Sequence, residues 1–474
     1  MKWFKHLLSR INRPTPYNQL PPEKVRAALV KNPWARKQII KFSLDEYEIN
    51  PYYASVINNL GLHTLGPSPN LIGLSKNKQF NDAVEDEYSN WVSDNSVGFA
   101  FRKMREMAAL TGLGVGIPFK KTYTLNPVEL SYKVFGTHNL KTPVDADPSD
   151  RIIDGIQYDS NWEPERFFLV DQDKEYLHVP YTANDTKEYT VEECVYWSRG
   201  YSDGRMSPIP ECTAAFQTYP FIRRFLQAVV EGEEMKASHP MALEVDATVY
   251  SVANKRDPPK GQFNYEPRTI KTLPPGTKLT GMPPGMSGTE QTRLIRLFAS
   301  ACALTVNMPA NIALADSADS NMSSAQVDIQ PWANKIAVDR FDLEPTIRRV
   351  FREWYSLALL RDGVFNQASM LRRTFPQTFP HTYVYVDIHS HPDPTKRANA
   401  RAIDLKSGAT TLAHIYSQLG LNGRRQLEKG AELLGLSVED YQQLLISNWG
   451  NIHDNSAQSS REDEDEGSRV RDRT

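Results

Sequence analysis

Cysteine is scarce in this sequence. Cys194, Cys212 and Cys302 are the three cysteines among 474 residues, and they form no CxxC pair. An odd number of widely spaced cysteines argues against a disulfide framework or a zinc knuckle and fits a reducing cytoplasm. Cys302 lies in an apolar run, so we expect it to be a small residue of the core.

Long apolar runs and a strong net charge are also missing. No segment approaches the roughly 20 apolar residues that a membrane-spanning helix needs. The first residues, MKWFKHLLSRINRPTP, have Lys5, His6 and Arg10 within the apolar part and no small-residue cleavage site, which predicts a short amphipathic arm rather than a signal peptide. Because the net charge is −2, contact with nucleic acid must come from local basic patches or be weak.

Motifs of nucleotide binding and catalysis are absent as well. The glycine-rich stretch Gly112–Gly116 is followed by Ile117–Phe119 instead of GK[ST], and the expected order of helix, glycines and strand is the reverse of a dinucleotide fingerprint. No GxSxG elbow occurs, and no spacing of cysteine, histidine and asparagine resembles a protease. The sequence therefore predicts a protein that is not an enzyme and has no cofactor.

The composition that is present indicates several folded units. Hydrophobic residues make up 40% and charged residues 24%, as in ordinary folded proteins, and the length exceeds what one core supports. Residues 51–110 have helical periodicity, and short strands follow over about 112–200. The 32 prolines outnumber the 25 glycines, which suggests rigid extended connections.

The middle of the chain alternates between helices and polar or proline-rich connections. Two helical segments flank a proline-rich insertion, residues 240–286, with β-candidates at Ala242–Tyr250 and Lys278–Gly281. The small, polar run Leu314–Ser324 predicts a loop. A helical region then extends to Arg361, and we expect its two prolines to break it into pieces.

The C-terminal part begins with a strand-like run, Thr382–His389. Short helices follow, which we expect to end at Gly408, Gly420 and Gly435, and a last helix begins near Ser437. The remaining tail, residues 451–474, is polar and mixed in charge, so we expect it to be disordered.

Two clusters of chemically active side chains need an interpretation. Asp387, His389, His391 and Asp393 could converge on one face of a strand and hold a metal ion, but no third histidine or cysteine lies nearby. Basic clusters on predicted helices usually lie in solvent or pair with nearby carboxylates, and contact with phosphate is the alternative. These clusters are Arg223 with Arg224, and Arg348 and Arg349 with Arg352; the nearby carboxylates are Glu231, Glu233, Glu234 and Glu353.

Several segments, in their order along the chain, carry a resemblance to a known family. They are Arg151–Asp159 (RIIDGIQYD), Val191–Trp197 with Gly204–Pro208, Leu273–Gly276 (LPPG), Asn321–Ala325 (NMSSA), and Asp393-Pro394 with Lys396 and Ala400, followed by Gly408–Thr410 and Leu419-Gly420. This ordered set resembles the lambda-type family of phage portal proteins over roughly residues 30–440.

The resemblance implies an α+β portal fold with several regions. A mixed α/β wing, long stem helices, a small α/β clip and a helical crown are expected. The corresponding segments are an N-terminal arm (1–30), the wing (31–208), a stem helix (209–239), the clip (240–286), a second stem helix (287–306), the tunnel loop and wing helices with a strand (307–392), the crown (393–450) and the tail (451–474).

The resemblance also implies a function. The chain is expected to form a ring, a dodecamer in this family, through which double-stranded DNA enters and leaves the capsid. Terminase, a head-tail connector or adaptor, and the major capsid protein are the implied partners, with no membrane. The implied location is the portal vertex of the virion, after assembly in the host cytoplasm.

The same resemblance suggests residues that line the channel. The expected tunnel-loop residues are Asp316, Asp319, Asn321, Ser323 and Ser324, whose carboxylates would repel phosphate. Arg223 and Arg224 are the candidates for cations that face DNA. Two alternatives stay open: another phage connector or minor capsid protein, and a metal-dependent hydrolase built around His389 and His391.

Overall fold

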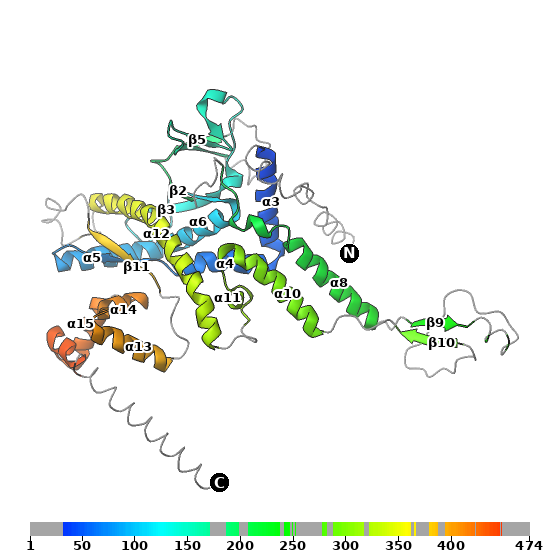
Figure 1. The fold of residues 1–474 in the computed structure, drawn as a ribbon. Coiled ribbons are helices and arrows are strands. Elements are labelled where there is room, and N and C mark those ends of the chain that lie inside the picture. Colours follow the sequence, from blue (N-terminus) through cyan, green and yellow to red (C-terminus); the bar gives the residue numbers. More distant parts are fainter. Residues whose placement is uncertain are drawn as a thin grey trace, which may run out of the picture. The chain divides into compact units, whose positions relative to one another are not determined.

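The structure is a computed structural model that describes most of the chain (Figure 1). The described residues are 32–170, 186–198, 207–237, 241–246, 249, 252, 277–281, 288–316, 322–361, 365, 379–386, 394–421, 423–445 and 447. The chain divides into two units: unit 1 is Met1–Ile57 with Ile209–Asp328, and unit 2 is Asn58–Pro208 with Ile329–Thr474. The described elements are mostly helical with short antiparallel strands, which confirms the mixed α/β class.

Unit 1 is a group of helices joined by aromatic contacts. Its described helices are α3 (Pro33–Ile49), the first part of α4 (Pro51–Leu65), α8 (Tyr219–Ala237), α10 (Gly288–Ala303), α11 (Ala310–Leu314) and the start of α12 (Met322–Leu360), with 3-10 turns at Glu211–Ala215 and Leu304–Val306. The ring of Tyr53 meets those of Phe216 and Tyr219 at 5.8 and 5.0 Å between centroids. These rings pack α4 against the start of α8, where Pro220 occupies the first turn, a position that proline tolerates.

The proline-rich insertion carries an antiparallel strand pair. Strand β9 (Met241–Val245) pairs with β10 (Thr277–Gly281), and the register runs from Thr277 opposite Val245 to Gly281 opposite Met241. Both β-candidates in this segment are therefore confirmed, although the first ends at Val245 rather than at Tyr250.

The described residues of unit 2 form three small antiparallel sheets. Strand β2 (Leu113–Lys120) lies between β3 (Leu130–Gly136) and β8 (Val195–Ser198). A second sheet has the order β4 (Ile152–Ile153), β5 (Ile156–Tyr158), β6 (Pro164–Val170), β7 (Thr186–Thr190), and a third pairs β1 (Asn70–Gly73) with β11 (His381–Val384).

The glycine-rich stretch has a structural explanation. Gly112 ends α6 (Val97–Thr111) with a φ of 90°, which favours glycine. A Cβ on Gly114 would lie 2.3 Å from the carbonyl oxygen of Met104, so this strand packs directly on the helix. The predicted order of helix, glycines and strand is thus confirmed.

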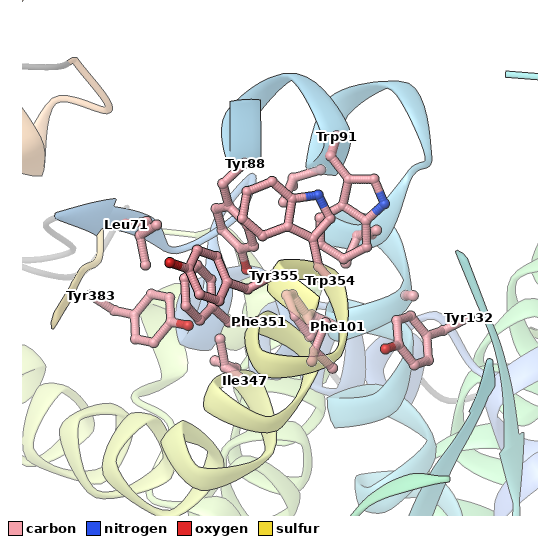
Figure 2. Packing of buried hydrophobic residues seen from close by; sticks show 14 of the residues in the cluster. Leu71, Tyr88, Trp91, Phe101, Tyr132, Ile347, Phe351, Trp354, Tyr355 and Tyr383 are labelled. Atoms are coloured by element: carbon pink, nitrogen blue, oxygen red, sulfur yellow. The ribbon is translucent and has the colours of Figure 1, made fainter. Parts of the chain in front are cut away.

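The core of unit 2 is aromatic (Figure 2). Helices α5 (Lys78–Asp94), α6 and α12 (Met322–Leu360) supply most of it. Trp91 stacks on Trp354 at 5.8 Å between centroids, and Phe351 stacks on Tyr355 at 5.6 Å. Since Trp91 and Trp354 have no exposed surface, these rings fix α12 against α5.

Helix α12 corrects one prediction. It runs without a break through Pro331 and Pro345, which were expected to divide it. A proline removes the hydrogen bond to the carbonyl four residues earlier, and these carbonyls belong to Val327 and Phe341. Both residues are largely exposed, at 65% and 77%, so water can solvate the two carbonyls while the opposite face of the helix stays packed.

The C-terminal helices of unit 2 end where glycine permits. They are α13 (Pro394–Ser407), α14 (Leu412–Gln418) and α15 (Gly423–Leu434). Gly408, Gly420 and Gly435 follow them with φ values of 71°, 76° and 64°, as predicted. Residues 438–445 are helical too, and the Ser437 hydroxyl accepts a hydrogen bond from the Asp440 amide as its N-cap.

In the described part of the chain, every helix is too short or too polar to span a bilayer.

Candidate functional site

The segment between α11 and α12 was the main candidate for a functional loop. Helix α11 is tied to α4 because the Ser55 hydroxyl donates to the carbonyl of Ala313 at 2.8 Å. Ala315 then adopts a left-handed φ of 51° and turns the chain out of the helix. Asp316, the next residue, forms an ion pair with Arg296 of α10. The first residues of the loop are therefore anchored at two points within unit 1.

The five predicted loop residues have different outcomes. The side chain of Asp316 is 37% exposed and is paired with Arg296 rather than isolated. Asp319 and Asn321 lie outside the described residues. Ser323 and Ser324 are in the first turn of α12, which is a correction of the loop boundary. Small polar residues favour helix N-termini as well as loops. The predicted loop therefore included residues that belong to the first turn of the helix.

The two arginines of the basic pair on α8, Arg223 and Arg224, have different surroundings. Arg223 forms an ion pair with Glu46 of α3, whose side chain is buried, and not with the glutamates of its own helix. Burial, with a smaller contribution from the neighbouring Arg224, lowers the pKa of Arg223. Arg224 is exposed, and its guanidinium lies 6.0 Å from the ring centre of Phe221. Of the two, Arg224 is the residue directed to solvent.

The second basic cluster is paired along its own helix. Arg348 pairs with Glu344 at 2.5 Å, and Arg349 lies 3.6 Å from Glu353, one of the expected partners. These are half-exposed pairs at i,i+4 spacing, which stabilise a helix only slightly.

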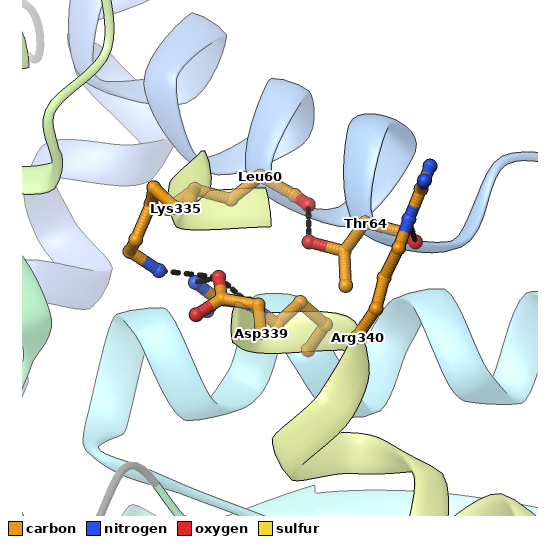
Figure 3. Close-up of polar contacts among 6 residues, drawn as sticks. Leu60, Thr64, Lys335, Asp339 and Arg340 are labelled. Carbon is orange, nitrogen blue, oxygen red and sulfur yellow. Dashed lines mark hydrogen bonds and ion pairs between the residues drawn. The ribbon is translucent and has the colours of Figure 1, made fainter. Parts of the chain in front are cut away.

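A buried ion cluster on α12 was not found from the sequence (Figure 3). Arg105 of α6 donates to Asp339 Oδ2 from Nε at 3.2 Å and from Nη2 at 2.8 Å, and Lys335 pairs with the same carboxylate. Burial alone would raise the pKa of Asp339, but the charges of Arg105 and Lys335 outweigh it and lower the pKa. The i,i+4 spacing of Lys335 and Asp339 could have predicted their ion pair, but not the contact with Arg105.

Arg340, next to this cluster, joins the end of α4 to the end of β11. Its Nε donates to the Thr64 carbonyl at 2.8 Å, and its Nη2 donates to the carbonyls of His63 and Val386 at 2.9 and 3.0 Å. The last carbonyls of a helix carry partial negative charge, so a guanidinium is a favourable cap there. The clamp holds α12 against two segments that are distant in the sequence.

His63 completes the polar contacts of α12. Its Nδ1 accepts a hydrogen bond from the Trp332 indole at 2.9 Å, which requires the proton of the neutral ring to be on Nε2. Burial lowers the pKa of His63, and the nearby Arg340 lowers it further. The imidazole is therefore a neutral acceptor.

These clusters position helices rather than activate a nucleophile. Burial raises the pKa of Cys194 and of Cys302 to about 12, which leaves both as unreactive thiols. Among the described residues, no three histidine, cysteine, aspartate or glutamate side chains lie together so that they could hold a metal ion. The suspected metal cluster at Asp387, His389, His391 and Asp393 falls outside the described residues.

Comparison with known proteins identifies the family. The family model of the phage portal protein, lambda family, matches residues 45–338, which is more than half of the chain. The chain therefore belongs to the lambda family of phage portal proteins, and the resemblance seen in its sequence motifs is confirmed. Portal proteins are structural, non-enzymatic components of the virion, and both descriptions apply to this chain. No curated protein matches the sequence.

Solved structures from gene transfer agent (GTA) particles are similar to this chain. A chain from the neck of an empty GTA particle, computed with C6 symmetry, has 10% identity and a TM-score of 0.45, and the match covers 80% of this chain and 93% of that one. A chain from the virion of a native GTA particle has 12% identity and a TM-score of 0.42, with 81% and 93% covered. A third, from the neck of the native particle computed with C12 symmetry, has 11% identity and a TM-score of 0.41, with 80% and 93% covered.

Proposed function

We propose that this chain is the subunit of a dodecameric portal ring at one vertex of a phage capsid. DNA is packaged and ejected through the ring, and terminase and the head-tail connectors dock on it. The observation that carries the proposal is the family match over residues 45–338, because it spans parts of both units and the whole helix-insertion-helix segment.

The arrangement within unit 1 supports a stem and clip assignment. Helices α8 and α10 pack against each other, and the β9–β10 pair lies between them in the sequence. We assign residues 209–239 and 287–306 to the stem and residues 240–286 to the clip, which contacts neighbouring subunits and terminase. The remaining assignments are the wing for 31–208, the tunnel loop with wing helices for 307–392, and the crown for 393–450.

The channel surface is assigned to the segment between α11 and α12. In this proposal Asp316, Asp319 and Asn321 face the channel, with Ser323 and Ser324 at the start of α12. Carboxylates repel phosphate, although less so at Asp316, which is paired with Arg296, and a channel must not retain DNA because each retained contact slows translocation. Arg224 is the candidate for a weak contact with DNA, since its neighbour Arg223 is paired with Glu46.

Electron microscopy of the purified chain together with a docking assay tests the proposal. Closed rings with a central channel are expected, and deletion of residues 240–286 should leave folded subunits that no longer bind terminase. A connector or minor capsid protein would not bind terminase through this insertion. Normal DNA packaging by the deletion variant would show that the clip assignment is wrong.

A further inference from the structure

Helix α12 has a second face with apolar side chains, and this one lies in solvent. Val327 is 65%, Val338 is 56% and Phe341 is 77% exposed, whereas Ile336 and Leu343 on the packed face have no exposed surface. Six exposed residues follow one another along this face at alternating intervals of four and three: Val327, Pro331, Asn334, Val338, Phe341 and Pro345. Such spacing is typical of a seam that packs against another helix. We call these six residues the α12 seam.

The surface beside the α12 seam is negatively charged. Asp328 and Asp342 are exposed, and in the described part of the chain neither forms an ion pair. The two cations between residues 327 and 345 are occupied, since Lys335 pairs with Asp339 and Arg340 donates to the carbonyls that it clamps. Nucleic acid is a poor occupant of this face because carboxylates repel phosphate.

Two backbone carbonyls add hydrogen-bond acceptors to the α12 seam. Pro331 and Pro345 have no amide proton to donate to the carbonyls of Val327 and Phe341, four residues earlier in the helix. Lysine and arginine side chains carry several donors and no acceptor, so they suit both these carbonyls and the neighbouring carboxylates. The matching occupant is therefore a helix with apolar and cationic side chains.

The start of the N-terminal arm has this composition. Residues 1–13 lie outside the described residues, but their sequence, MKWFKHLLSRINR, contains Lys2, Lys5, Arg10 and Arg13 and no carboxylate. Its larger apolar side chains recur at the spacing of one helix face: Trp3, Phe4, Leu7, Leu8 and Ile11. As a helix, thirteen residues would be about 20 Å long, close to the roughly 21 Å from Val327 to Phe341 along α12.

The exposed face of α10 is a weaker match for the α12 seam. It has an apolar side chain in Leu297, which is 62% exposed. However, Arg296 is already paired with Asp316, and the exposed Glu290 adds a negative charge. Four cations without a carboxylate make residues 1–13 the better complement to an acidic, apolar surface.

We propose that residues 1–13 of one subunit lie along the α12 seam of the next subunit. This inference rests on the proposed ring. In the single chain the seam is exposed, so we assign it to the arm of a neighbour. Residues 14–31 can span up to about 60 Å at roughly 3.3 Å per residue, which leaves a neighbouring subunit within reach.

The proposed contact has the form that a ring requires. An amphipathic helix that lays its apolar face on an exposed apolar surface is a common mode of recognition. Each subunit would give one arm and receive one, so the contact joins different surfaces of identical chains. Head-to-tail contacts of this kind close into rings.

Charge reversal in the full chain tests both sides of the contact. Asp328→Lys/Asp342→Lys reverses the seam, Lys5→Glu/Arg10→Glu reverses the arm, and Asp328→Glu/Asp342→Glu is the matched control. Measured by mass photometry, the concentration for half-assembly should rise at least about tenfold in each reversed variant. It should stay within about threefold of the wild-type value in the control and in the chain that combines both reversals. Circular dichroism of the dissociated chains should be unchanged, because the substituted seam residues are exposed.

Cross-linking identifies which surfaces meet and between which chains. A chain with Lys5→Cys is mixed with a chain with Asp342→Cys, assembled into rings and treated with a short bis-maleimide. We expect a covalent dimer, and none when the second chain carries Ser93→Cys, at an exposed position of α5 away from the seam. The three native cysteines are buried and should not react.

The possible results separate this inference from the proposed function. Normal assembly of both reversed variants would overturn the inference and leave the proposed function standing, as would a loss of assembly that the combined reversals do not restore. If Lys5→Cys/Asp342→Cys gave only a monomer of altered mobility, the arm would lie on its own chain, which also overturns the inference. If the wild-type chain forms no rings, the proposed function fails and this contact between subunits fails with it.

Discussion

The face of helix α12 that packs on α5 and α6 differs from the helix pair α8 and α10 in how much of its apolar surface the chain itself covers. In α12 the rings and aliphatic side chains that face α5 and α6 are buried, with Trp354 and Ile347 fully so. Among the side chains of α8 that the structure describes, Ile222 is the last that is buried, and Val230 is 56% exposed; in α10, Leu297 is 62% exposed. This face of α12 is covered within one chain, whereas α8 and α10 keep apolar side chains exposed, which the proposed ring would use for contacts between subunits.

The comparison separates two kinds of substitution. Changes around α12 should lower the free energy of unfolding of a single chain. Changes on the exposed faces of α8 and α10 should act on assembly and leave the single chain nearly unaffected.

The largest effect is expected at the buried ion cluster. Asp339→Ala leaves Arg105 and Lys335 buried without their carboxylate, and we expect a loss of about 3–5 kcal/mol in the free energy of unfolding. Denaturant unfolding followed by tryptophan fluorescence measures it. The control is Glu344→Ala, which breaks the half-exposed pair with Arg348 and should cost about 0–1 kcal/mol. If the two variants lost the same free energy of unfolding, burial would not be what makes the Asp339 cluster important.

A somewhat smaller loss is expected in the aromatic core. Ile347→Ala removes a fully buried side chain (Figure 2) and should destabilise the chain by about 2–5 kcal/mol. Phe341→Ala on the exposed face of the same helix is the control, with a change within about 0.5 kcal/mol. If Phe341→Ala cost as much as Ile347→Ala in the dissociated chain, the account of α12 would be wrong.

A pH effect is expected from His63. Its pKa is lowered in the folded chain, so the unfolded state binds more protons below the ordinary histidine pKa of about 6.5. The free energy of unfolding should be highest above that pH and should fall as the pH drops below it, by at most about 1.4 kcal/mol per pH unit. His63→Asn should reduce this slope between pH 6.5 and 5. If the free energy of unfolding of His63→Asn fell with pH as steeply as that of the wild type, the His63 imidazole would not be a neutral hydrogen-bond acceptor in the folded chain.

The smallest effect on the single chain is expected on α10. Leu297→Ala should change the free energy of unfolding of the dissociated chain by less than about 0.5 kcal/mol, because the side chain is already in solvent. In the assembled particle the same variant should raise the dissociation midpoint concentration, measured by dilution. A large loss of stability in the single chain would remove the contrast with α12.

The sequence predicted local features better than long-range contacts. The helix ends at Gly408, Gly420 and Gly435 and the strand after Gly112 follow from backbone rules that act over a few residues, and the structure confirms them. The continuity of α12 could not be predicted, because the tolerance of its prolines depends on which face of the helix is solvated.

The candidate site was predicted less completely. Arg105 belongs to a helix that periodicity indicated, but its burial depends on Asp339, which is 234 residues away. Arg223 and Glu46 are also far apart in the sequence, by 177 residues, so no local pattern could predict their pairing. A charge on a predicted helix is normally solvated, and only tertiary contacts decide otherwise.

The mass of the assembled particle tests the central claim most directly. Native mass spectrometry of the purified chain should give one dominant species of about 650 kDa, the mass of twelve 53.8-kDa chains in a closed ring. A chain that stays a 53.8-kDa monomer under all assembly conditions, or that forms open aggregates without a defined mass, would contradict the account.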